Sequence, residues 1–142
     1  KKVLTYYDRQ SMIAVVRQTK YNKKGVVMVE ISSDVIRGYN DTIILFLLKD
    51  EPSYGYEIQK QIRNLSEEKY IIKETTLYSA FTRLEKSGFV ESYADDTSGK
   101  KRTYYKITDE GRQYYNDKCM EWDLTKEVIE NFIVREVENG NN

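Results

Sequence analysis

The clearest periodic pattern of hydrophobic and polar positions lies between residues 75 and 87. Leu77, Ala80, Phe81 and Leu84 recur at the spacing of one helix face. The other face carries short polar side chains and one lysine: Thr75, Thr76, Ser79, Thr82 and Lys86. This pattern predicts an amphipathic helix whose outer face suits a DNA groove, because small hydroxyl side chains let the backbone approach phosphates and base edges.

A hairpin is predicted directly after this helix. Gly88 is placed to end the helix in the left-handed conformation. Residues 89–94 and 102–107 predict two strands, and residues 95–101, which contain Ser98-Gly99, predict the turn between them. The hairpin would place three bases beside the helix: Lys100, Lys101 and Arg102.

Upstream, the pattern predicts two more helices. The first runs from about Asp34 to Lys49 and ends before Glu51-Pro52; its apolar face would hold Val35, Tyr39, Ile43 and Leu47. Ser53 is a candidate N-cap for the second, whose inward residues would be Ile58, Ile62 and Leu65. Residues 70–73 are extended in pattern and predict a third strand beside the hairpin.

The last predicted helix begins after Thr108, a candidate N-cap, and continues to about Glu138. At about 30 residues it would be ~45 Å long, more than so small a domain can cover. Its apolar positions follow a heptad-like spacing: Tyr115, Cys119, Trp122, Ile129, Phe132, Ile133 and Val137. Such a stripe normally meets a partner helix, so these residues predict a homodimer interface.

Helix, hairpin and basic tip in this order make a winged helix-turn-helix. The fold class is therefore mainly α with a small β-wing, followed by a long C-terminal helix. The segments TTLYSAFTRLEKSGFVES (75–92) and GKKRTYYKITDEG (99–111) resemble the PadR family of transcriptional regulators, in its short form, and SYGYEI (53–58) matches the entry to that family's second helix. Thr75 and Ser79 stand where glycine and proline are frequent in the family, which bears on the operator and not on the fold.

The resemblance extends from about Ile31 to Phe132 and implies a DNA-binding homodimer. In that family the final helix is the dimerisation element, and a two-fold dimer presents two recognition helices about 34 Å apart to a palindromic operator. Some PadR-like sensors stack flat aromatic ligands on a tryptophan of this helix, and Trp122 resembles that residue. The alternative for Trp122 is simple packing in the interface.

The expected DNA contacts come from three places. Helix 75–87 would reach bases through Thr75, Thr76, Tyr78, Ser79 and Thr82. Lys73 and the wing residues Lys100, Lys101 and Arg102 would meet phosphates or enter the minor groove. Tyr54 and Tyr78 either touch DNA or serve structure, and the basic triplet is alternatively a solvated turn.

Composition argues against an enzyme. The chain of 142 residues has no histidine, which removes the commonest general base and metal ligand, and it contains no phosphate-binding loop motif. We therefore expect no cofactor or metal. The single cysteine, Cys119, predicts no disulfide framework and is more simply a small apolar residue. With no apolar run near the ~18 residues of a membrane span and no visible signal peptide, the expected location is the cytoplasm.

Net charge is zero but is sorted along the chain. Residues 69–106 hold eight Lys or Arg against five acids, whereas residues 117–142 hold three against seven. The basic part coincides with the proposed DNA face. The rival function is a protein-interaction module that keeps the winged fold without binding DNA, which the neutral net charge favours and the basic wing opposes.

Three regions are expected: a basic N-terminal segment (1–27), a winged-helix DNA-binding domain (28–107), and a C-terminal dimerisation helix with its tail (108–142). The first holds seven bases and one acid. It is either a true basic arm or upstream sequence translated before Met28, since Lys23 to Val27 can be encoded by a purine-rich stretch of the ribosome-binding type.

Overall fold

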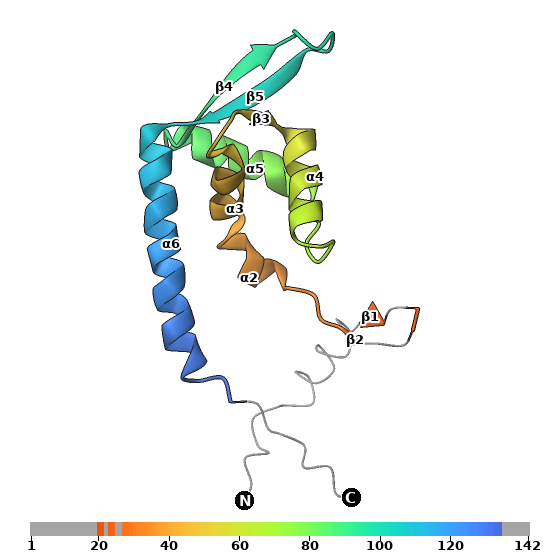
Figure 1. Ribbon diagram of the computed structural model, residues 1–142, viewed down its shortest axis with the longest axis vertical. Helices are drawn as coiled ribbons and strands as arrows, with labels where there is room; N and C mark the ends of the chain where they lie inside the picture. Colours follow the sequence, from red (N-terminus) through yellow and green to blue (C-terminus); the bar gives the residue numbers. More distant parts are fainter. Residues whose placement is uncertain (1–19, 22, 25–26, 135–142) are drawn as a thin grey trace, which may run out of the picture.

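The computed structural model describes residues 20–21, 23–24 and 27–134. Its described elements follow one another along the chain as β1 (Lys20–Tyr21), β2 (Val27–Met28), α2 (Ser33–Arg37), α3 (Asn40–Leu48), β3 (Ser53–Tyr54), α4 (Gly55–Leu65), α5 (Glu74–Lys86), β4 (Val90–Asp95), β5 (Arg102–Ile107) and α6 (Asp109–Glu130). Figure 1 shows α3, α4 and α5 grouped beneath the β4–β5 wing, with α6 descending along one side. None of the described helices is long and apolar enough to cross a membrane.

The core forms where the three central helices meet the base of the wing. Its fully buried large side chains are Ile44, Leu45, Leu48, Ile58, Leu77, Phe81, Leu84 and Val90. Phe81 stacks on Tyr105 with the ring centroids 3.8 Å apart, which joins α5 to β5. The predicted inward face of residues 75–87 is confirmed, because all four of its apolar residues are buried.

The wing is also confirmed in position. β4 and β5 pair antiparallel, with Val90 opposite Ile107 and Asp95 opposite Arg102. Gly88 has φ +78°, in the left-handed region that a side chain adopts only with strain. Glycine at this point ends α5 and turns the chain into β4.

The third strand of the sheet is β3, and not residues 70–73 as predicted. Ser53 pairs with Tyr105 and Tyr54 with Tyr104, giving the strand order β3-β5-β4. Ser53 is thus a buried strand residue and not a helix cap, and Tyr54 stands at the N-cap of α4 without a side-chain cap hydrogen bond. The residue types at Ser53 and Tyr54 are compatible with both an edge strand and a helix start.

Residues 70–73 are held in irregular structure by side-chain hydrogen bonds. The Tyr70 hydroxyl donates to Oδ1 of the buried Asn40 at 2.6 Å, and Gln59 donates to the carbonyl of Ile72 at 3.3 Å. Burial raises the pKa of Tyr70, and the Asn40 hydrogen bond opposes that shift. These contacts replace the strand pairing that the sequence pattern suggested.

The predicted helix 34–49 is divided into α2 and α3 at Gly38 and Tyr39. Glycine inside a helix costs about 1 kcal/mol relative to alanine, which favours a break there. The predicted inward face is partly right, because Ile43 and Leu47 are half-buried and pack against the core. The fully buried residues, however, are Ile44, Leu45 and Leu48, and Val35 is 56% exposed. In α4, Ile58 and Ile62 are buried as predicted, but Leu65 is 68% exposed.

Helix α6 begins as predicted and ends earlier. The Thr108 hydroxyl accepts a hydrogen bond from the amide of Gly111 at 3.0 Å, which confirms the N-cap. The helix stops at Glu130, where the Asn131 side chain donates to the Glu127 carbonyl at 3.1 Å and so satisfies an end carbonyl. Phe132 and Ile133 lie beyond the helix, whereas Val137, Glu138 and most of residues 1–27 lie outside the described residues.

Candidate nucleic-acid interface

The outer face of α5 is open to solvent. Thr75, Ser79 and Thr82 are exposed and Thr76 is half-buried. Thr82 donates its hydroxyl hydrogen to the Tyr78 carbonyl at 3.0 Å, so its oxygen remains able to accept a hydrogen bond. The structure therefore places the predicted polar residues together on one accessible face.

Tyr78 connects this face to the start of α4. Its ring packs edge-on against Phe81 at 5.9 Å, and its side chain is 45% exposed. A Cβ atom at residue 55 would lie only 2.7 Å from the Tyr78 hydroxyl oxygen. Glycine at position 55 therefore gives the tyrosine room to lie across the N-terminus of α4.

Arg102 begins β5 at the turn end of the wing, opposite Asp95, and its side chain lies against the Tyr54 ring. Its guanidinium carbon is 4.4 Å from the centroid of the Tyr54 ring, a cation–π geometry. The Tyr54 ring lies 5.3 Å from Tyr104, which in turn stacks on Tyr93 at 5.7 Å. This aromatic row ties β3 to both wing strands, and its contact with Arg102 spans 48 residues of sequence, so no local periodicity reveals it.

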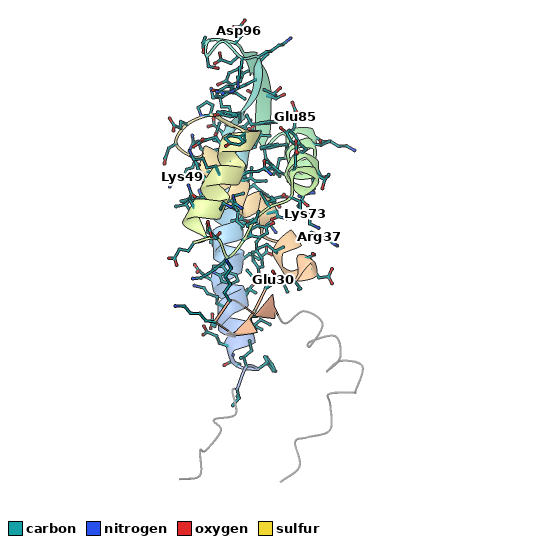
Figure 2. All side chains as sticks on the ribbon, turned by 90° about the vertical axis from the view of Figure 1, so that its right-hand side faces the viewer. Glu30, Arg37, Lys49, Lys73, Glu85 and Asp96 are labelled. Atoms are coloured by element: carbon teal, nitrogen blue, oxygen red, sulfur yellow. The ribbon has the colours of Figure 1, made fainter. Side chains whose placement is uncertain are left out.

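The turn of the wing carries bases and acids together. Lys100 and Lys101 are exposed there, and Figure 2 shows Asp96 at the tip. Asp95 Oδ1 accepts hydrogen bonds from the hydroxyl and amide of Thr97, at 2.7 and 2.8 Å, which lower the pKa of its carboxyl. The two lysines thus extend from a turn whose shape is fixed by Asp95.

Both helices of the helix-turn-helix begin without a side-chain cap. Neither the Tyr54 side chain before α4 nor the Lys73 side chain before α5 forms a capping hydrogen bond with the first turn. Free amide groups at a helix start attract phosphate. Each first turn also holds one acid, Glu57 or Glu74, which limits that attraction.

The basic side chain of Arg83, within residues 69–106, makes an ion pair within the protein. Arg83 forms an ion pair with Asp41 of α3, and the Asp41 hydrogen bond raises the pKa of Arg83 while burial opposes it. Sequence counting assigned this charge to the DNA face. Because Asp41 lies outside the counted segment, the local excess of positive charge available to DNA is smaller than predicted.

The described residues of the predicted dimer interface differ in how exposed they are. Tyr115 and Cys119 are half-buried; Tyr115 packs on the core and lies 6.4 Å from the Phe46 ring. The other four are exposed on the isolated protomer: Trp122 at 45%, Ile129 at 47%, Phe132 at 81% and Ile133 at 60%. These four side chains form an apolar stripe that is exposed to solvent along the lower half of α6 and the residues after it.

Trp122 lines a groove of about 830 Å³ between α6 and the α2–α3 segment. The opposite wall includes Val35, Tyr39 and Ile43 of the same chain. The Tyr39 ring meets Trp122 edge-on at 5.2 Å, and Lys126 Nζ lies 5.7 Å from the indole centroid. The tryptophan therefore already has an aromatic neighbour and a cation beside an open apolar groove.

Comparison with known proteins agrees with this architecture. Residues 44–117 match the model of the Transcriptional regulator PadR-like family. A protein of Lysinibacillus sphaericus named Uncharacterized protein X is 45% identical over 104 residues, covering 72% of this chain and 95% of the relative.

Two solved structures of relatives are similar in fold. A transcriptional regulator from Clostridium thermocellum is 61% identical with a TM-score of 0.69, covering 72% of this chain and all of its own. A PadR family transcription regulator from Clostridium difficile is 38% identical with a TM-score of 0.59, covering 66% of this chain and 97% of its own. The described fold, a winged helix-turn-helix followed by a long helix, belongs with these proteins. The chain is a member of the PadR-like family of transcriptional regulators.

Proposed function

We propose that this regulator is a cytoplasmic homodimer that binds a palindromic DNA operator as a repressor and is released by a small-molecule signal. The observation that carries the DNA-binding part is the convergence of three elements. The open polar face of α5, the uncapped start of α4 and Arg102 of the wing meet around Tyr54, Gly55 and Tyr78.

The contacts divide by chemistry. Thr75, Tyr78 and Ser79, with Thr76 and Thr82, lie on α5 and offer hydroxyl groups to base edges in the major groove. Lys73, Lys100, Lys101 and Arg102 meet phosphate or the minor groove. Tyr54 borders the uncapped start of α4 and completes the surface.

Dimerisation would follow from the exposed stripe on α6. Covering Trp122, Ile129, Phe132 and Ile133 with the same surface of a second copy removes apolar area from water, and a two-fold axis makes that contact self-complementary. Tyr115 and Cys119 lie at the inner edge of this stripe.

The signal is proposed to act through Trp122. A flat aromatic molecule entering the groove can stack on the indole. The two acids at the groove, Glu121 and Asp123, are already paired with Lys118 and Lys126, so stacking and not charge carries this part of the proposal. Such a molecule releases DNA only if it binds the two dimer geometries unequally. Saturable quenching of the single tryptophan by cationic dyes, weakened by operator DNA, tests this directly.

The division of contacts is tested with two classes of variant on promoter fragments from the source genome. Lys100→Ala and Lys101→Ala should weaken binding to all sequences alike and reduce the salt dependence. Ser79→Ala and Tyr78→Phe should instead change the preference among operator variants. Equal effects of both classes on every sequence would contradict this assignment, whereas no binding of the unaltered protein to any fragment would favour a winged module that binds protein.

A further inference from the structure

Arg102 differs from the other wing bases in being held by an aromatic ring. Lys100 and Lys101 extend from an exposed turn, whereas Arg102 is half-buried and lies 4.4 Å from the centroid of Tyr54. The ring is itself fixed, because Tyr54 pairs with Tyr104 in the sheet and the two rings lie 5.3 Å apart. A guanidinium on a fixed ring loses less conformational freedom when it forms a directed contact.

The ring also lies at the junction of the wing and the recognition helix. Tyr54 is followed by Gly55, and the Tyr78 hydroxyl of α5 occupies the space where a Cβ of residue 55 would lie. One continuous path therefore runs from Arg102 through Tyr54 to Tyr78. This path sets the position of the Arg102 guanidinium relative to α5.

We infer that Tyr54 is a positioning residue for DNA binding: its ring holds the planar guanidinium of Arg102 in place for a directed phosphate contact. The inference rests on the proposed DNA-binding function. Tyr54 acts here through its ring, so its hydroxyl is dispensable. Arg102 supplies an oriented contact, and Lys100 and Lys101 supply unoriented charge.

A double-mutant cycle on the full chain tests this inference. The DNA is a promoter duplex that the unaltered protein retains, and affinity is measured at one fixed salt concentration. Arg102→Lys keeps the charge and loses the planar fork, and it should weaken binding roughly two- to fivefold. Tyr54→Leu should weaken binding to the same extent, and the double variant should be no weaker than either single variant.

Two further variants separate positioning from a general structural role. Tyr54→Phe keeps the ring and should recover the affinity that Tyr54→Leu loses. Tyr93→Leu removes a ring from the same aromatic row, which contacts Tyr104 and for which no contact with Arg102 is found among the described residues. In that background Arg102→Lys should still cause its full loss. Thermal unfolding of each variant establishes that it is folded at the assay temperature.

The outcomes are distinct. Independent, multiplicative effects of Tyr54→Leu and Arg102→Lys would overturn the inference while leaving DNA binding intact. A loss with Tyr54→Phe equal to that with Tyr54→Leu would also overturn it, because the hydroxyl would then make the contact itself. Failure of the unaltered protein to retain any promoter duplex would overturn the proposed function and this inference together.

Discussion

Arg83 on α5 donates two hydrogen bonds to the carboxylate of Asp41 on α3, from Nε at 3.2 Å and from Nη2 at 2.5 Å. The Asp41 side chain is only 18% exposed, whereas that of Arg83 is 51% exposed. The pair joins α5 to α3. Its geometry is bidentate, which is the stronger form of a surface ion pair.

This pair predicts a stability effect that is separate from DNA binding. Asp41→Asn or Arg83→Gln should lower the free energy of unfolding by about 1 kcal/mol, since the pair is partly exposed and screened. Denaturant unfolding measures this change, and the double variant should lose little more than either single one. In DNA titrations, Arg83→Gln should leave the salt slope unchanged. A salt slope reduced as much as by Lys101→Ala would show that Arg83 meets phosphate.

The start of α6 depends on a close backbone approach at Gly111. A Cβ there would lie 2.1 Å from the Phe89 carbonyl oxygen and 2.9 Å from Ile107 Cγ1. Gly111→Ala should therefore destabilise the protein by about 3 kcal/mol, as overpacking against backbone does. Gly38→Ala is the control, because its nearest neighbour would be 3.8 Å away, and it should change stability by less than about 1 kcal/mol. Similar melting temperatures for the two variants would be inconsistent with this packing.

The turn of the wing should respond to acid through Asp95. Because the folded-state pKa of this carboxyl is lowered by its Thr97 hydrogen bonds, their stabilisation is present above the unfolded pKa. It is lost as the pH falls through the folded pKa, in the window below about pH 4. The Thr97 amide resonance, followed by NMR, should titrate with a midpoint below that of an aspartate in an unstructured peptide. A midpoint at or above that value would show that these hydrogen bonds do not stabilise the Asp95 carboxylate.

The dimer surface is tested with charges placed within the proposed interface and, as a control, on the opposite face of α6. Ile129→Asp and Phe132→Asp alter side chains that are exposed in the protomer, so the variants should fold but sediment as monomers. Met120 is also exposed, and it precedes Ile129 by nine residues, which places it about 180° away around the helix. Met120→Asp should remain dimeric. Unaltered dimers of both Ile129→Asp and Phe132→Asp would place the interface elsewhere.

The sequence pattern predicted those elements that are determined by residues close together in the chain. The inward face of α5, the glycine after it, the wing and the Thr108 cap each depend on neighbouring residues, and all were predicted correctly. The third strand was misplaced because pairing between Ser53 and Tyr105 joins residues far apart in sequence. The break of helix 34–49 depended on a single glycine whose cost competes with strong flanking hydrophobicity.

In the candidate site, too, only the features that depend on neighbouring residues were predicted. The polar face of α5 was predicted because helix periodicity orients it. Two relationships were not predicted: Arg102 lies over Tyr54, and Arg83 is neutralised by Asp41. Both are long-range pairings between side chains of complementary chemistry, for which the chain offers many alternative partners. Counting charges along a segment cannot distinguish a base that faces DNA from one that supports the fold.

The proposal that the α5 face and the wing bind duplex DNA is tested by titrating fluorescent promoter duplexes with the full chain. Affinity is measured at several salt concentrations, for the unaltered protein and for Lys101→Ala. This proposal predicts that the DNA is retained at low salt and that the affinity falls by orders of magnitude over a few-fold rise in salt. The affinity of the variant should depend less steeply on salt. No retention of any duplex at low salt, by a protein that is folded and dimeric, would contradict it.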